Sequence, residues 1–179
     1  DVNLNEISTM TVGFSGAALE AMMNEAAFIA VNEGFEEINM HHIERAFYKM
    51  IMKGDKKQNQ NNRDKKELEI VAYHEAGHAI ATKLYTNDTV SKVTIISSTS
   101  GAGGATFRTP KEMKLYSKEY IKSLIKVMYA GRAAEYILLQ NDDAITTGAA
   151  NDIKQATKLI KEYLSMYGMN EKIGLINTQ

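Results

Sequence analysis

The sequence contains no cysteine, and this absence limits both its covalent chemistry and its metal chemistry. Without cysteine the chain forms no disulfide bond and offers no thiolate to a metal ion. A metal would have to be held by imidazole and carboxylate groups, a donor set that suits a catalytic site better than a closed structural one. The positions of the four histidines therefore decide where a metal site can be sought.

The chain also has no large excess of positive or negative charge and no long apolar run. The net charge of the 179 residues is −1 at pH 7, which leaves no electrostatic basis for binding nucleic acid or an anionic membrane. No apolar run approaches the roughly 18 residues that a transmembrane helix needs, and no signal peptide is visible. Hydrophobic residues at 44% and charged residues at 24% are ordinary for a globular protein. These features predict a soluble chain of one or two domains.

The motif His74-Glu75-Ala76-Gly77-His78 is the strongest chemical signal in the sequence. Apolar residues around it recur at helical spacing and predict a helix over residues 66–85. Two histidines four positions apart share one face of a helix, so both imidazoles can reach one metal ion. Glu75 lies beside them as a proton acceptor, the arrangement of a zinc hydrolase. The alternative is a pair of partly buried histidines that only bond to neighbours in the core.

Two helices are predicted in the first part of the chain. The first covers residues 16–32, with Ser15 as its N-cap. The second follows Asn39 as its N-cap and ends at Gly54. The apolar residues within positions 1–13 show no convincing periodic spacing, so no helix or strand is predicted there.

Residues 55–66 are wholly polar and cannot contribute to a hydrophobic core. They predict a linker between a domain of residues 1–54 and a domain of residues 67–179. His41 and His42 are adjacent, so they point in different directions on a helix, and both are predicted to lie on the surface.

The second half of the chain predicts two short strands followed by helices. Residues 91–97 and 105–108 have β-like composition, and Pro110 ends the second strand. Ser117 caps a long helix with an apolar stripe, and a last helix is closed by Gly168. The predicted fold class is mainly α with a small β element (α+β).

A hydrolytic zinc site needs a third protein ligand, which here must be a carboxylate because no histidine follows His78. The acidic residues available in the second half are Glu112, Glu119, Glu135, Asp142, Asp143, Asp152, Glu162 and Glu171.

Two of these carboxylates lie in segments rich in small residues. Glu135 ends Gly131-Arg132-Ala133-Ala134-Glu135, and Asp152 follows Thr146-Thr147-Gly148-Ala149-Ala150-Asn151. Asp152 has a simpler explanation as an acid in the first turn of a helix, and Glu135 as an ion-pair partner of Arg132. Spacing alone does not choose between them.

Four blocks of the sequence, in order along the chain, resemble the FtsH family of membrane-anchored AAA+ zinc proteases. Two blocks resemble the helical lid of an ATPase module and the zinc helix, and two resemble later peptidase segments. They are Gly13-Phe14-Ser15-Gly16-Ala17-Ala18-Leu19 with Asn24-Glu25-Ala26-Ala27, Val71-Ala72-Tyr73-His74-Glu75-Ala76-Gly77-His78-Ala79, Gly131-Arg132-Ala133-Ala134-Glu135, and Thr146-Thr147-Gly148-Ala149-Ala150-Asn151-Asp152.

The resemblance implies a helical AAA+ lid followed by a mostly helical zinc peptidase domain. It implies that Asp152 is the third Zn²⁺ ligand beside His74 and His78, and that Glu135 orients a ligand imidazole. Glu75 would be the catalytic proton acceptor in the hydrolysis of peptide bonds. The remaining implied contacts are weaker: Gly16 and Ala17 as lid contacts to the nucleotide, and Gly104, Ala105, Thr106 and Phe107 as a strand on which unfolded substrate lies.

The resemblance also implies properties of a longer protein. These are ATP and Mg²⁺ dependence, a hexameric ring, and anchoring in an organellar inner membrane or a bacterial plasma membrane for protein quality control. No G-x-x-x-x-G-K-[ST] phosphate loop is present, so we expect a fragment, truncated in its peptidase domain, that does not hydrolyse ATP alone. The rival hypothesis is a non-catalytic, hexamer-forming module in which zinc is structural or absent.

Overall fold

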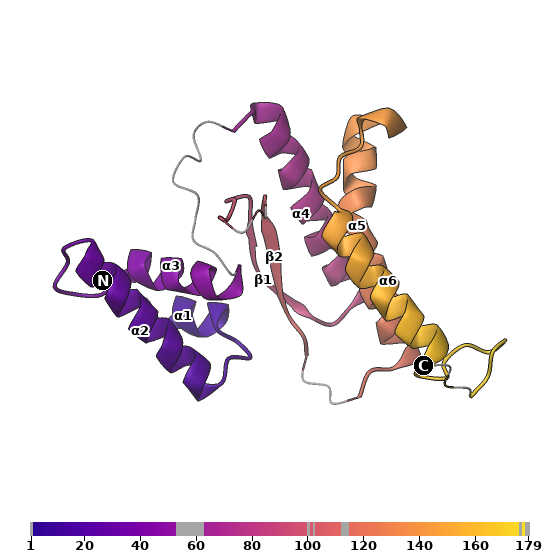
Figure 1. Ribbon diagram of the computed structural model, residues 1–179, viewed down its shortest axis with the longest axis horizontal. Helices are drawn as coiled ribbons and strands as arrows, with labels where there is room; N and C mark the ends of the chain where they lie inside the picture. The colour runs from indigo at the N-terminus through magenta and orange to yellow at the C-terminus, as the bar shows by residue number, and fades with distance from the viewer. Residues whose placement is uncertain are drawn as a thin grey trace. The chain divides into compact units, whose positions relative to one another are not determined.

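The computed structural model describes residues 2–52, 63–99, 101, 103–111, 115–175 and 177. They form two compact units, one of Asp1–Arg63 with Ile95–Ala105 and one of Asp64–Thr94 with Thr106–Gln179. Helices dominate both, and the strands form one two-stranded sheet, so the predicted fold class is confirmed (Figure 1). Among the helices that the structure describes, none is both long and apolar enough to cross a membrane.

The first unit contains helices α1 (Leu4–Met10), α2 (Gly16–Asn32) and α3 (Met40–Ile51). The predicted helix over residues 16–32 is confirmed, and the Ser15 hydroxyl caps it by accepting the Ala18 N–H at 3.2 Å. Helices α2 and α3 pack on each other through fully or nearly fully buried apolar side chains, including Met22, Ala26, Ile29, Ile43 and Phe47. The predicted stop at Gly54 lies outside the described residues, as do positions 55–62 of the predicted linker.

The prediction that His42 lies on the surface is wrong. Its side chain is completely buried because it occupies the third position of α3, where it completes a capping box with Asn39. The ring nitrogen Nδ1 accepts the Asn39 N–H at 3.1 Å, and the Asn39 side chain accepts the His42 N–H at 3.3 Å. His41 is exposed, as predicted.

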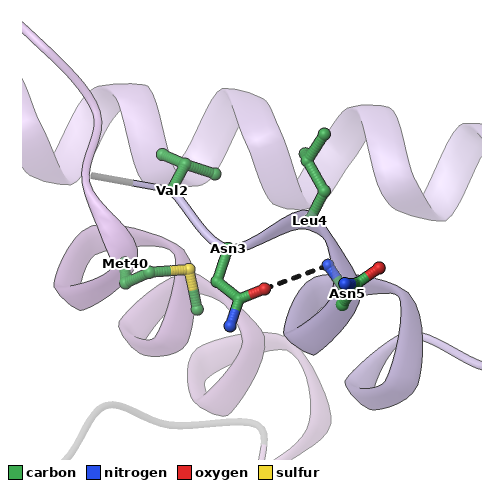
Figure 2. A pocket seen from close by; sticks show the side chains of 5 residues that line it. All are labelled: Val2, Asn3, Leu4, Asn5 and Met40. Atoms are coloured by element: carbon green, nitrogen blue, oxygen red, sulfur yellow. Dashed lines mark hydrogen bonds between the residues drawn. The ribbon is translucent and has the colours of Figure 1, made fainter.

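Helix α1 has no counterpart in the sequence prediction. It buries only Met10, so no apolar period marks it, and it begins because the Asn3 side chain accepts the N–H groups of Asn5 and Glu6. The open pocket at this end is lined by Val2, Asn3, Leu4, Asn5 and Met40 (Figure 2). None of the five side chains is titratable, so the pocket offers no acid, base or charged ligand.

The helices of the second unit are α4 (Lys65–Tyr85), α5 (Lys118–Leu139) and α6 (Ala150–Ser165), with the 3₁₀ turn η2 (Asp142–Ala144) between the last two. Helix α5 packs against both α4 and α6, as Figure 1 shows. Gly77 allows the approach of α4 to α5, because a Cβ atom there would lie 2.5 Å from the Ala130 carbonyl oxygen and 2.7 Å from the Ala134 Cβ.

The sheet pairs β1 (Thr89–Thr94) with β2 (Ala105–Thr109). The second strand matches the prediction to one residue, but the first was predicted too late, over residues 91–97. Ile95 is apolar and β-branched like a strand residue, yet it follows the strand. Its carbonyl oxygen instead accepts the Arg63 guanidinium at 2.6 Å, which also donates to the Gly103 carbonyl at 2.9 Å.

A buried polar cluster joins the sheet to α5. The fully buried Asp88 carboxylate, just before β1, accepts the Arg108 guanidinium at 2.6 Å and the Tyr120 hydroxyl at 2.9 and 3.0 Å. Arg108 belongs to β2 and Tyr120 to the first turns of α5. The start of one strand, the end of the other and the start of the helix are therefore fixed to one another.

Candidate metal centre

Helix α4 places His74 and His78 one turn apart with their rings in an edge-to-face arrangement. The ring centroids are 4.7 Å apart, and the two Nε2 atoms are 3.0 Å apart. Helix α6 brings in Asp152 from its first turn, with Oδ2 at 3.1 Å from His74 Nε2 and 3.4 Å from His78 Nε2. These three residues are the only group with metal-ligand geometry in the described part of the chain.

The hydrogen-bond partners of the two Nδ1 atoms decide which nitrogen of each imidazole carries a lone pair. His78 Nδ1 lies 2.7 Å from the Val127 carbonyl oxygen, and His74 Nδ1 lies 2.7 Å from Glu135 Oε1. A carbonyl and a carboxylate only accept hydrogen bonds, so both Nδ1 atoms donate, and in the neutral rings both Nε2 atoms carry lone pairs. Two lone pairs and an Asp152 carboxylate oxygen thus converge on one point.

Such a convergence of acceptors favours a bound cation. Burial lowers the pKa of His74, but the hydrogen bonds to Asp152 and Glu135 outweigh burial and raise it. Burial likewise raises the pKa of Asp152, and the two imidazoles outweigh it and hold that pKa far below its usual range. Two neutral imidazoles and one carboxylate are the donor set of a hydrolytic zinc site, so the residues present fit a zinc ion.

Glu135 on α5 supports the site by its contact with His74 Nδ1, the ring nitrogen that does not face Asp152. Its side chain is 1% exposed, and besides the His74 contact its Oε2 accepts the Thr146 hydroxyl at 2.9 Å and the Thr146 N–H at 3.3 Å. Arg132, the expected ion-pair partner of Glu135, donates instead to the Thr146 carbonyl at 3.0 Å. One carboxylate thus connects the first imidazole to the loop that precedes α6 and Asp152.

Gly131 leaves room for both imidazoles. A Cβ atom at this position would lie 2.5 Å from His74 Nε2 and 2.6 Å from His78 Nε2. Any larger residue would push into the centre of the site, which explains the glycine at position 131.

Glu75 lies beside the two histidines and is 7% exposed. Its carboxylate oxygen Oε2 accepts the Thr106 hydroxyl of β2 at 2.7 Å. Burial raises the pKa of Glu75, while the Thr106 hydrogen bond and the two imidazoles act in the opposite direction. Sequence reasoning named Thr106 only as part of a substrate strand, because no local pattern indicates which helix a strand side chain will meet.

The other predicted residues lie apart from this cluster or beside it. Gly104, Ala105 and Phe107 are half-buried, and the last two belong to β2 with Thr106. Gly16 and Ala17 are exposed in the first turn of α2, in the other unit. Thr146 was not predicted as a site residue, although it lies in a segment that the sequence had marked.

A helix that carries a histidine pair with an adjacent glutamate, completed by a carboxylate from another helix, is the arrangement typical of the class of metal-dependent hydrolases. Comparison with known families agrees: the model of peptidase family M41 matches residues 61–179, and the model of the AAA+ lid domain matches residues 1–45. The chain belongs to peptidase family M41.

Several named relatives match nearly the whole chain. The ATP-dependent zinc metalloprotease FtsH of Lachnoclostridium phytofermentans is 44% identical over 179 residues, 99% of this chain and 31% of the relative. That of Helicobacter pylori is 40% identical over 98% of this chain and 27% of the relative. The chloroplastic ATP-dependent zinc metalloprotease FTSH 1 of Arabidopsis thaliana is 37% identical over 98% of this chain and 25% of the relative. The chain spans less than a third of the length of these relatives.

Proposed function

We propose that the chain hydrolyses peptide bonds of unfolded polypeptides, with zinc held by His74 Nε2, His78 Nε2 and Asp152. The main support is the convergence of these three donor atoms within 3.4 Å of one another, beside the buried carboxylate of Glu75. Membership of a peptidase family and the names of the relatives, which are zinc metalloproteases, support the same conclusion. Three protein ligands leave the fourth position of a tetrahedral zinc ion open.

Zinc at this position would polarise the scissile carbonyl and lower the pKa of a water molecule to about 7. Glu75 acts as the general base: its Oε1 takes a proton from the attacking water and delivers it to the leaving nitrogen. Because burial raises the pKa of Glu75, its conjugate acid is stabilised and the carboxyl can hold the proton between the two transfers. Glu135 holds His74 in the tautomer whose Nε2 is free to bind metal.

The substrate would bind to the sheet. Among the described residues β2 pairs with β1 along one edge, and we propose that an extended polypeptide adds to its other edge through main-chain hydrogen bonds. Gly104, Ala105, Thr106 and Phe107 would form this binding strand. Side chains alternate along a strand, so Thr106 would point away from the face that carries Ala105 and Phe107.

We extend the proposal to the longer relatives as follows. They are named ATP-dependent, and residues 1–45 match an AAA+ lid, so the lid would respond to ATP and Mg²⁺ bound elsewhere in the ATPase module, with Gly16 and Ala17 near the nucleotide. ATP hydrolysis would unfold and deliver substrate to a hexameric peptidase ring. Anchoring in a bacterial or organellar membrane, and a role in removing damaged proteins, belong to the same proposal. We assign residues 1–54 to the lid and 67–179 to the peptidase domain.

Cleavage of casein by the zinc-loaded protein, with ATP and Mg²⁺ present, tests the function. We expect Glu75→Gln to keep its zinc and to lose at least about 100-fold in rate, because only the proton acceptor is removed. The matched control is Glu69→Gln, an exposed glutamate on the same helix, which should cleave like the wild type. Removal of zinc by a chelator should abolish cleavage, and added zinc should restore it. A wild-type protein that carries one zinc per chain and leaves casein intact would contradict the proposal and favour the non-catalytic ring module.

A further inference from the structure

Among the residues that the structure describes, the Thr106 hydroxyl has two hydrogen-bond partners, and both are atoms of Glu75. Its Oγ1 lies 2.7 Å from the Glu75 carboxylate oxygen Oε2 and 2.9 Å from the Glu75 main-chain carbonyl oxygen. The contact spans strand β2 and helix α4, which are 31 positions apart in sequence at these residues. No hydrogen bond to the second carboxylate oxygen, Oε1, is found within the part of the chain that the structure describes.

The strand that carries Thr106 is itself held in place. Arg108, two positions further along β2, projects from the same side of the strand and is tied to the buried Asp88 carboxylate at 2.6 Å. Asp88 is in turn bonded to Tyr120 of α5. Thr106 and Arg108 therefore fix β2 at two successive positions on this side, and the hydroxyl of Thr106 meets Glu75 from a fixed direction.

We propose that Thr106 is a positioning residue for the general base: its hydroxyl fixes one oxygen of the Glu75 carboxylate and leaves the other for proton transfer. The inference rests on the proposed function. The Thr106 hydroxyl donates to Oε2 of the ionised carboxylate. When Oε1 gains the proton, Oε2 becomes the carbonyl oxygen of the acid and still accepts a hydrogen bond, so the same O–H group can keep donating to it. One hydrogen bond thus keeps Glu75 in place throughout the cycle.

The alternative is that Thr106 only packs the strand against the helix. Two substitutions separate the hydroxyl from the packing: Thr106→Val keeps the shape and removes the hydroxyl, and Thr106→Ser keeps the hydroxyl and removes a methyl group. With casein or a peptide as substrate, we expect Thr106→Val to lower kcat by about 10- to 100-fold, the usual size of a supporting hydrogen-bond effect at such sites. KM and zinc content should stay unchanged, and Thr106→Ser should keep kcat within about threefold of the wild type.

A binding measurement provides a readout that does not depend on turnover. A peptide hydroxamate loses a proton when it binds zinc, and the nearest base must hold that proton. Calorimetry on the zinc-loaded wild type, Thr106→Val, Glu75→Gln and the double variant forms a double-mutant cycle. Thr106→Val should weaken hydroxamate binding in the wild-type background and have no further effect in the Glu75→Gln background, because its effect passes through Glu75.

The outcomes divide clearly. A Thr106→Val protein with unchanged kcat and unchanged hydroxamate affinity would overturn the inference. So would an equal loss in Thr106→Ser, which would indicate packing, or a loss confined to KM, which would indicate substrate binding by the strand. If the zinc-loaded wild type does not cleave protein at all, the proposed function fails, and the hydroxamate cycle still decides whether Thr106 acts through Glu75. If Thr106→Val fails to bind zinc, Thr106→Ser compared with Thr106→Ala in the same cycle decides the question.

Discussion

At the scale of single residues, the site depends on which nitrogen of each imidazole carries the proton. His78 is held by the main-chain carbonyl of Val127, which no side-chain substitution removes. His74 is held by the side chain of Glu135, which is buried and also bonded to Thr146. The orientation of His74 is therefore the one that mutation can change.

Glu135→Gln is expected to lower zinc affinity by about 10- to 100-fold, because the amide keeps the shape of the side chain but removes the charge that holds the His74 Nδ1–H. Zinc affinity can be measured by competition with a chromophoric chelator. Glu119→Gln is the matched control, since Glu119 lies on the same helix and is exposed. Equal zinc affinity in the two variants would show that Glu135 has no part in metal binding.

At the scale of elements, three helices and one strand must meet within a few ångströms for the site to exist. Helix α4 alone supplies both histidines and Glu75, while α5 supplies their supports, α6 supplies Asp152 and β2 supplies Thr106. Small residues make this approach possible, since a Cβ atom at Gly77 would collide with the α5 backbone and one at Gly131 with the imidazoles. The geometry of the site is thus a property of helix packing.

The polar cluster around Asp88 holds the sheet to α5, so removing the Asp88 carboxylate should lower the free energy of unfolding. Asp88→Ala leaves the Arg108 guanidinium and the Tyr120 hydroxyl without their acceptor, and breaking a buried pair in this way costs about 3 kcal/mol of unfolding free energy. Tyr120→Phe removes only one neutral donor and should cost about 1 kcal/mol. Urea denaturation followed by circular dichroism gives both values.

A surface ion pair between Lys118, the first residue of α5, and Glu171, which follows α6, serves as a control. Lys118 donates to Glu171 at 2.6 Å, but the Glu171 side chain is 89% exposed, so Glu171→Ala should leave the urea midpoint unchanged. If Asp88→Ala unfolds at the same urea concentration as Glu171→Ala, the cluster does not stabilise the unit.

At the scale of the whole molecule, all proposed metal ligands and their supports belong to one of the two units. The other unit has its own buried core between α2 and α3. Ligand binding stabilises the structure that forms the site, by about 4 kcal/mol when free zinc exceeds the dissociation constant 1,000-fold.

Zinc binding is therefore expected to slow amide hydrogen exchange mainly in α4, α5 and the first turns of α6. The helices α2 and α3 should show little change, because none of the proposed ligands or their supports belongs to these helices. Hydrogen exchange read by mass spectrometry, with and without zinc, measures this directly. Equal protection of α2 and α5 on adding zinc would show that the two units respond as one cooperative structure.

Sequence patterns predicted the elements that bury a regular apolar stripe and missed those that do not. The helices over residues 16–32 and 66–85 were recognised because their apolar residues recur at helical spacing. Helix α1 buries a single side chain and left no such pattern. Ile95 is apolar and β-branched, as strand residues often are. Its carbonyl oxygen instead accepts a hydrogen bond from Arg63, and β1 ends before it, at Thr94. His42 was misplaced because it lies one turn before Ala46 on the buried face of α3, where its ring completes the capping box with Asn39.

The sequence by itself determined that two imidazoles share one helix face, with a glutamate next to the first of them, because a spacing of four residues is a local property of the α-helix. It also indicated, through the absence of cysteine and of any histidine after His78, that the third ligand should be a carboxylate. Only the tertiary structure decided which carboxylate reaches the imidazoles, since Glu135 and Asp152 lie on different helices and their distances to His74 depend on how α5 and α6 pack against α4. It placed Asp152 at one ring nitrogen of His74 and Glu135 at the other, a division that no spacing along the chain encodes.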